Sequence, residues 1–291
     1  MIQYPAFRTW QTMQKRWNNN IVALSIGANL AQQAMARPGH PVAQASALLA
    51  AVPQAERLDV TAAEAGRIFE SAATNMAFLA IPHVMALHIE LCVGTVVECQ
   101  RFPGLIKPNK QTPNWWSVPL LHETVRFNDA KTTADHLLGF CLKLRNTMMH
   151  GAGKVDEPLV QRWKDLPAAA KTRWEDLSGR PFTYTEIGET PTLNWPEIMA
   201  TLAVTKESAH EINARIGRLL TREQWAQVIA RDYRDASQKG RRRFNSAAPG
   251  TKDAGPVHHR VMQRLQGHAL TYYRPLSMTA DELHAGRDTI R

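Results

Sequence analysis

The sequence has few cysteines and lacks the short motifs that mark several large enzyme classes. Its three cysteines, Cys92, Cys99 and Cys141, form no CxxC pair. An odd number of cysteines argues against a disulfide framework and favours small buried residues of a reduced, cytoplasmic protein. No P-loop, GxGxxG or HExxH pattern occurs, so the sequence does not indicate a P-loop NTPase, a dinucleotide-dependent enzyme or a zinc protease.

Segments that direct a chain to a membrane are also scarce. The N-terminus lacks the charged and then apolar arrangement of a signal peptide. One run, residues 76–97, is long enough for a transmembrane helix, but it contains Pro82, His83, His88 and Glu90. Because a charge deep in a bilayer costs on the order of 3 kcal/mol, the run predicts a buried core helix and no membrane association.

The chain has ample length and an excess of positive charge. Its 291 residues are enough for one or two domains with a sizeable core. Lys and Arg number 35 against 26 Asp and Glu, which gives a net charge of +9. This excess favours a polyanionic partner such as nucleic acid, although many soluble proteins carry a similar charge.

Apolar spacing and capping residues predict an all-α fold, mainly a helical bundle. Residues 5–36 are expected to form two helices, with a cap at Asn18–Asn20 between them. Thr61 and Glu64 form a capping box that opens a long helical region. Pro82 is expected to kink or divide that region, because proline lacks the backbone N–H of a helix interior.

The remaining patterns divide the chain into parts. Aromatic and β-branched residues around Gly188 predict a small β-hairpin at about 180–195. The predicted organisation is an N-terminal helical extension (1–55), a helical domain with an insertion at about 151–193 (56–237), a basic flexible linker (238–257) and a C-terminal tail (258–291).

The most distinctive chemistry lies in LRNTMMHGAG, residues 144–153. An amphipathic helix is expected to end here, because glycine at position 151 commonly follows the last helical turn. Asn146 and His150 are four residues apart and therefore share one helix face. The long side chain of Arg145 can curl towards that face, so the three groups can converge.

These three residue types match the needs of RNA cleavage without a metal. A guanidinium grips phosphate through paired hydrogen bonds, and an imidazole gives or takes a proton near neutral pH. The amide of Asn146 can orient either the phosphate or the imidazole. One copy of the chain supplies a single histidine, His150, to this group of residues, whereas the reaction needs a base and an acid. A two-fold dimer is therefore expected.

The run Arg145-Asn146-Thr147-Met148-Met149-His150 followed by Gly151 resembles the RNxxxH pattern of the HEPN superfamily (higher eukaryotes and prokaryotes nucleotide-binding domain). Many members are metal-independent ribonucleases that act as dimers in bacterial toxin, abortive-infection and CRISPR systems. The resemblance implies an all-α bundle, catalytic Arg145 and His150, a supporting Asn146, and no cofactor. It also implies a toxin or phage-defence role with an inhibitory antitoxin or an activating partner.

Other residues receive supporting roles. Glu90 is a candidate for the acidic residue that such families often carry on an earlier helix. A further set of residues could bind RNA. The tryptophans could stack on bases or anchor their loop, and the arginines could bind phosphates or form a solvated charge run. The candidate RNA-binding residues are Lys107, Lys110, Trp115, Trp116, Arg241, Arg242 and Arg243.

Two less specific interpretations stay open. Arg145 and His150 also fit ordinary stabilisation of a helix C-terminus, where cations are favoured by the helix dipole. The chain would then be a non-catalytic helical RNA- or protein-binding regulator or scaffold. His83 and His88 are five residues apart and face different ways, so polar core residues are favoured over a metal site.

Overall fold

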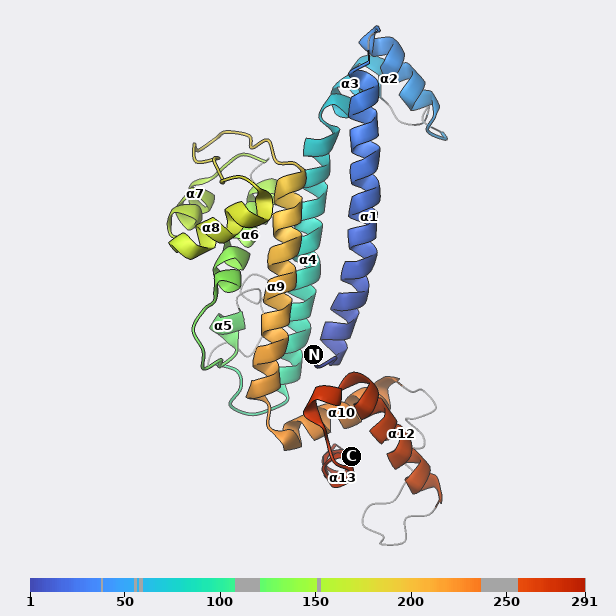
Figure 1. The fold of residues 1–291 in the computed structure, drawn as a ribbon, viewed down its shortest axis with the longest axis vertical. Coiled ribbons are helices and arrows are strands. Elements are labelled where there is room, and N and C mark those ends of the chain that lie inside the picture. Colours follow the sequence, from blue (N-terminus) through green and yellow to red (C-terminus); the bar gives the residue numbers. More distant parts are fainter. Residues whose placement is uncertain are drawn as a thin grey trace. The chain divides into compact units, whose positions relative to one another are not determined.

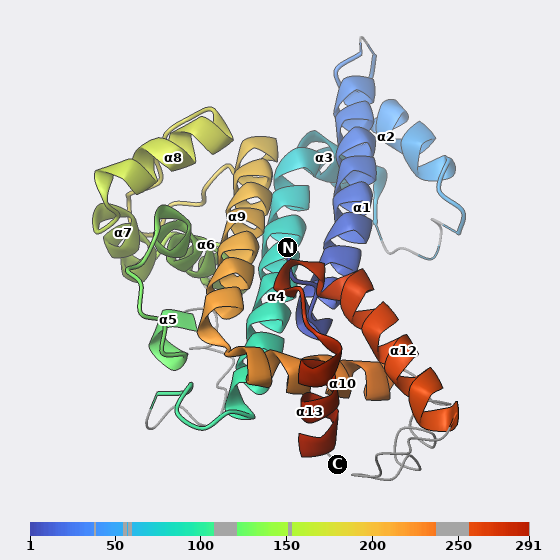
Figure 2. The same ribbon diagram turned by 60° about the horizontal axis from the view of Figure 1, so that its bottom comes forward.

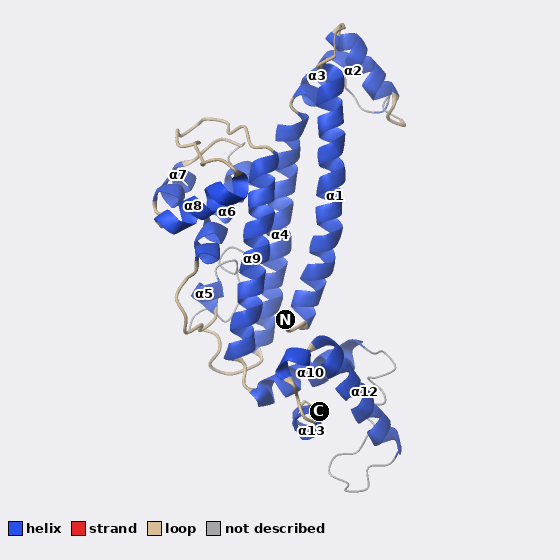
Figure 3. Cartoon of the chain, viewed as in Figure 1, coloured by secondary structure: helices blue, strands red, loops and turns tan. Residues whose placement is uncertain are grey.

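The computed structural model describes residues 1–37, 39–54, 57, 60–107, 121–150, 153–236 and 256–290. These residues are mainly helical and contain no strand, which confirms the all-α prediction (Figures 1 and 3). One isolated antiparallel bridge joins Ile106 and Val125. The helices are α1 (Pro5–Met35), α2 (Pro41–Ala50), α3 (Ala62–Glu70), α4 (Ala72–Gln100), α5 (Leu121–Thr124), α6 (Thr133–His150), α7 (Glu157–Lys164), α8 (Ala168–Ser178), α9 (Trp195–Leu219), α10 (Arg222–Ala236), α12 (Pro256–Tyr272), the 3-10 turn η2 (Arg274–Leu276) and α13 (Ala280–Thr289).

Contacts divide the chain into two compact units. Unit 1 comprises residues 1–11, 88–130 and 207–291, and unit 2 comprises residues 12–87 and 131–206. The long helices α1, α4 and α9 each contribute residues to both units. The boundaries expected from the sequence, at residues 55, 237 and 257, stay predictions, since the contacts group the chain differently.

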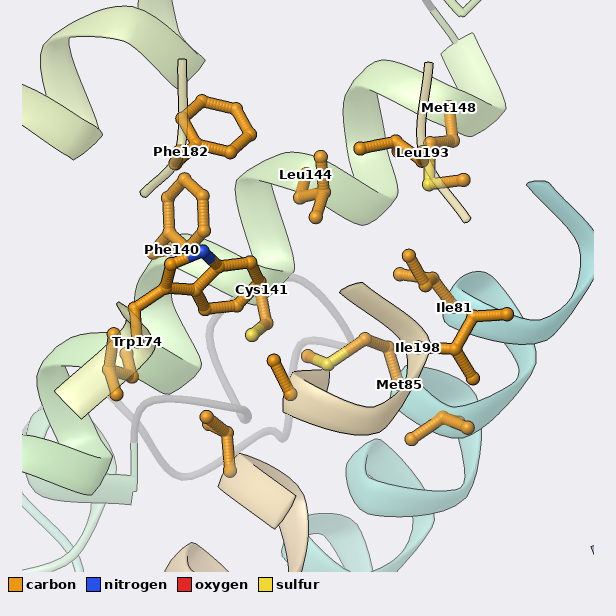
Figure 4. Close-up of a cluster of buried hydrophobic side chains, with 14 of the residues drawn as sticks. Ile81, Met85, Phe140, Cys141, Leu144, Met148, Trp174, Phe182, Leu193 and Ile198 are labelled. Carbon is orange, nitrogen blue, oxygen red and sulfur yellow. The ribbon is translucent and has the colours of Figure 1, made fainter. Parts of the chain in front are cut away.

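Unit 2 is built around the buried face of α6. Phe140 of α6 makes edge-to-face contacts with Trp174 and Phe182, at centroid distances of 5.0 and 4.9 Å. Such aromatic contacts add to the stabilisation that comes from burying apolar area. Figure 4 shows the further core side chains, which include Ile81, Met85, Cys141, Leu144, Met148, Leu193 and Ile198.

Unit 1 is held together by a buried carboxylate on α10. Asp232 accepts hydrogen bonds from Arg8 at 2.6 and 2.8 Å, from His268 at 2.8 Å and from Tyr273 at 2.7 Å. Arg8 comes from α1, whereas His268 and Tyr273 come from the end of the chain. The apolar side chains of α12 and α13, such as Leu265, lie in the same core cluster as those of α10. The C-terminal segment is therefore an integral part of unit 1.

Two predicted helix boundaries are wrong. α1 runs unbroken through Asn18–Asn20, because its packed face continues from half-buried Trp17 to buried Ile21 and Ser25. α4 continues through Pro82, so the division expected there is wrong and a kink stays a prediction; the helical region divides at the C-cap of α3 instead. Packing of α1 and α4 in the core of unit 2 thus overrides the local preferences of asparagine and proline.

The hairpin expected around Gly188 does not form, because residues 180–194 contain no strand. The backbone of this loop bonds to Val155 and not to a facing strand: Gly188 donates to the Val155 carbonyl, and the Val155 N–H donates to Glu189, both at 2.8 Å. The hydroxyl of Tyr184 donates to the Thr192 carbonyl at 2.8 Å. An irregular loop thus satisfies these groups without a second strand.

The apolar run of α4 is long and apolar enough, over Met76–Gln100, to cross a membrane. Within its most apolar window, 56% of the helix is buried inside the structure. Ile81 and Met85 lie in the core of unit 2, and Leu91 and Cys92 lie in the core of unit 1. This burial agrees with the core helix expected from the sequence.

The three cysteines are expected to be unreactive in the folded protein. All three are buried free thiols, and burial raises the pKa of both Cys99 and Cys141 to about 12. The thiolate is the reactive form, so a thiol reagent at pH 8 should modify almost no cysteine until the protein unfolds. Counting reactive thiols before and after denaturant tests this: rapid labelling of the native protein would contradict the buried placement.

Candidate functional site at the end of α6

α6 is fixed at its start by a capping box. The Thr132 hydroxyl accepts from the Asp135 N–H at 3.3 Å, and the Asp135 carboxylate accepts from the Thr132 N–H at 2.8 Å. Leu137 and Leu144 are fully buried in the core of unit 2. A capped and deeply packed helix gives its C-terminal turn a defined position.

That last turn brings the three candidate residues together. Nη1 of Arg145 donates to Oδ1 of Asn146 at 3.0 Å and lies 3.4 Å from Nε2 of His150. His150 is exposed, whereas Arg145 and Asn146 are half-buried. The convergence expected from the spacing is therefore confirmed: the guanidinium curls along the helix and lies between the amide and the imidazole.

In the part of the chain that the structure describes, no Asp or Glu forms an ion pair with the guanidinium of Arg145. Its Nε is buried and has no hydrogen-bond partner there. A buried donor without a partner is costly, and an arginine without a counter-ion is well suited to an anion such as phosphate.

A side chain that the sequence did not single out supports this turn. Asp156 caps α7 by accepting from the Leu159 N–H at 2.9 Å, and the same Oδ1 accepts from the hydroxyl of buried Thr147 at 3.3 Å. The connection ties the last turn of α6 to the start of α7. Aspartate shortly before a proline, here Pro158, is a common signal for the start of a helix and could have revealed the cap.

Gly153, just after the site, occupies a position that only glycine fits. Its φ is +74°, and an added Cβ would lie 2.6 Å from Cε1 of Phe78. Gly153 therefore packs directly against the aromatic ring of Phe78 on α4. This close approach and the N-cap at Asp156 fix the backbone at residues 153 and 156.

We expect Gly153→Ala to lower the free energy of unfolding by about 3 kcal/mol, from the left-handed backbone and the steric clash together. Gly179→Ala is the matched control, since Gly179 has a φ of +71° but no atom within 4 Å of an added Cβ. That variant should lose only about 1 kcal/mol. Equal losses in denaturant titrations of the two variants would contradict the packing of Gly153 on Phe78.

The two methionines beside the site differ in exposure. Met148 is buried in the core, and Met149 is 52% exposed. Of the two, only Met149 is available for contact with a second copy of the chain.

Of the supporting residues, only Glu90 and Lys107 are described, and both belong to unit 1. Glu90 is an exposed residue of α4 in unit 1, whereas the three site residues belong to unit 2. Lys107, also in unit 1, is half-buried, and its backbone N–H donates to Thr124 at 2.9 Å. The other candidates lie outside the described residues: Lys110, Trp115, Trp116, Arg241, Arg242 and Arg243.

The two histidines of α4 have separate surroundings. His83 packs against Trp17, with ring centroids 3.6 Å apart, and burial lowers its pKa. His88 is fully buried, and its Nε2 lies 3.3 Å from Oγ of Ser208. The two fall in different units, and no cluster of three or more metal-ligating side chains occurs within the described ranges. His88 fits the interpretation as a polar core residue, whereas His83 is half-buried.

The chain matches no known protein family, curated protein or solved structure. The resemblance to the HEPN superfamily therefore stays a hypothesis that rests on residues 145–151, of which Gly151 lies outside the described part. The geometry of Arg145, Asn146 and His150 is the structural observation that bears on function.

Proposed function

We propose that this protein is a metal-independent endoribonuclease whose active site is the C-terminal turn of α6. The observation that supports the proposal is Arg145, which pairs with no carboxylate of the described residues and is held 3.0 Å from the Asn146 amide oxygen and 3.4 Å from the His150 imidazole. Cleavage of a phosphodiester without a metal uses a fixed cation and groups that transfer protons, and this helix end supplies the cation and one such group.

The reaction is an internal transesterification. A neutral imidazole removes the proton from a ribose 2′-hydroxyl, and the 2′-oxygen attacks the adjacent phosphorus. The bond from phosphorus to the 5′-oxygen breaks, and an imidazolium protonates that oxygen. The products are a 2′,3′-cyclic phosphate and a 5′-hydroxyl. Arg145 neutralises the charge that develops on the non-bridging oxygens, and Asn146 holds the guanidinium in place.

The active form is a homodimer in this proposal. The described chain brings a single imidazole, that of His150, to the site, whereas the reaction uses one base and one acid. A two-fold contact between the ends of two α6 helices would supply the second histidine and would cover exposed Met149.

The biological setting follows by analogy with the superfamily. An unrestrained ribonuclease damages its own host, so a toxin or phage-defence role in the cytoplasm, with an inhibitory antitoxin or an activating partner, completes the proposal.

A second function is favoured by the same helix end. Basic side chains stabilise the last turn of a helix through the helix dipole, and Arg145 and His150 both lie there. In this alternative the chain is a non-catalytic helical regulator or scaffold that binds RNA or a protein.

Cleavage of a mixed RNA substrate in EDTA separates the two functions. We expect the wild type to cut and Arg145→Ala to lose about 10²–10³-fold in rate, as when one transition-state donor is removed. Lys143→Ala, on an exposed position of the same helix, is the control and should cut normally. RNA binding without cutting by the wild type would favour the alternative, and full activity of Arg145→Ala would exclude the proposed site.

A further inference from the structure

The N-terminal part of unit 2 is almost free of charge. Between residues 17 and 55 the only charged side chain is Arg37, although Asp, Glu, Lys and Arg make up 21% of the chain. Several large apolar side chains are nevertheless exposed there, namely Val22, Leu24, Ile26, Leu30, Val42 and Val52. A contiguous apolar surface without charge is typical of a protein interface.

The exposed apolar side chains of α1 form a stripe. One face of the helix packs against α3 and α4: Ser25 donates to the sulfur of Met76 at 3.2 Å, and Gln32 donates to the Glu70 carbonyl at 2.9 Å. Val22, Ile26 and Leu30 recur every four residues on the other side and are 47%, 56% and 59% exposed. Figures 1 and 2 show α1 beside α4.

The surroundings of the stripe suit a second helix. Ala23 and Gly27 are exposed beside it, and a Cβ added at Gly27 would meet no atom within 4 Å. Small residues let two helix backbones approach closely. Asn19 and Gln33 are exposed and uncharged, so they can hydrogen-bond to a protein partner.

We propose that this α1 surface, centred on Val22, Ile26 and Leu30, is an isologous interface with a second copy of the same chain. In a two-fold contact, a charge near the axis meets its own image and is repelled. A chain of net charge +9 can therefore associate with itself most readily through a surface that carries no charge.

Antiparallel pairing of α1 also keeps the single charge away from its image. With Ile26 on the two-fold axis, Val22 of one copy faces Leu30 of the other. The two Arg37 residues then lie ~33 Å apart along the helices, at ~1.5 Å per residue. That separation exceeds the Debye length of ~8 Å at physiological ionic strength, so their repulsion is screened.

A lipid surface fits α1 less well. Helices that bind membranes carry lysine and arginine on their polar face, which attract anionic lipids. The stretch from Trp17 to Ala36 has no charged residue, and it includes several asparagines and glutamines. A protein surface, unlike the acyl boundary of a bilayer, can satisfy these amides.

The α1 interface does not depend on the proposed ribonuclease activity. In Figures 1 and 2, α1 lies on one side of α4 and α9, and α6 lies on the other side. Pairing through α1 therefore leaves Arg145 and His150 uncovered. If the ends of α6 also pair, the two distinct contacts can together close a tetramer.

Light scattering of the full chain, coupled to size exclusion and without RNA, tests the interface. We expect Ile26→Glu to halve the mass of the wild-type assembly, because the two glutamates would face each other at the axis. Ile187→Glu introduces the same change at a position that is 67% exposed outside α1, and should leave the mass unchanged. Circular dichroism checks that both variants keep their helices.

A cross-linking experiment covers the case in which Ile26→Glu misfolds. Ile26→Cys should form a disulfide-linked dimer under mild oxidation, because residue 26 meets its own image and the native cysteines are buried. Ile187→Cys should stay mostly monomeric on a denaturing gel. A monomeric wild type, an unchanged mass for Ile26→Glu, or flotation with neutral lipid vesicles that Ile26→Glu abolishes would overturn the proposal.

Discussion

Replacing His150 with alanine is expected to slow RNA cleavage in EDTA by about 10²–10⁴-fold, the usual contribution of a general acid or base. The imidazole is exposed at the end of α6 and lies 3.4 Å from Nη1 of Arg145, so it can reach the 2′-hydroxyl or the 5′-oxygen beside a phosphate held by the guanidinium. His150→Gln should be equally slow, because an amide keeps the polarity but cannot transfer the proton.

His259→Ala is the matched control for this loss. His259 is also an exposed histidine, but it lies on α12 in unit 1, where its Nε2 is 3.0 Å from the Gln263 amide. The rate of this variant should equal that of the wild type in single-turnover assays. If His150→Ala cuts as fast as His259→Ala, His150 is not the acid or base.

Replacing Asp232 with asparagine is expected to lower the free energy of unfolding by about 3 kcal/mol, because removing one member of a buried charged network leaves the others without compensation. The carboxylate holds Arg8 and His268 and also accepts from Tyr273, so a single change weakens the contacts of α1, α10 and α12. Denaturant titration monitored by circular dichroism measures the loss.

The exposed pair of Arg222 and Glu282 provides the control for Asp232. Glu282→Gln removes a charge of the same sign in unit 1, but both side chains are partly in solvent, where ion pairs contribute little. Glutamine also keeps the capping box with Thr279. A loss for Asp232→Asn no larger than that for Glu282→Gln would show that the buried network does not stabilise unit 1.

The same carboxylate makes the stability of unit 1 depend on pH. Burial alone would raise the pKa of Asp232, but the hydrogen bonds from His268, Arg8 and Tyr273 lower it to about 2. The folded value is below the unfolded value of about 3.9, so the contribution is complete above that pH and is lost as pH falls towards 2. Asp232→Asn should therefore flatten the acid side of the stability curve.

The course of α6 and the convergence at its end could be predicted because both depend on local rules. The capping box of Thr132 and Asp135 forms from residues three apart, and the long side chain of Arg145 curls towards the face that Asn146 and His150 share. The capping box of Thr61 and Glu64 also forms. Each of these features involves residues within about one helical turn or two, so tertiary packing changes them little.

The features that the sequence did not reveal depend on distant residues. The helix breaks expected at Asn18–Asn20 and Pro82 are absent because α1 and α4 pack along their lengths in the core of unit 2. The link from Thr147 to Asp156 joins two helices through one carboxylate oxygen, and the role of Asp232 requires partners more than 200 residues apart. No local pattern encodes such pairings.

The chemical identity of the RNA ends shows directly whether the protein cleaves RNA by metal-independent transesterification. The wild type should be incubated with a defined RNA in EDTA, and the new termini identified by mass spectrometry and by labelling with polynucleotide kinase. We expect the wild type to produce 2′,3′-cyclic phosphates and free 5′-hydroxyls, and His150→Ala to produce neither. Termini with a 5′-phosphate, or cutting that needs a divalent metal, would contradict this expectation.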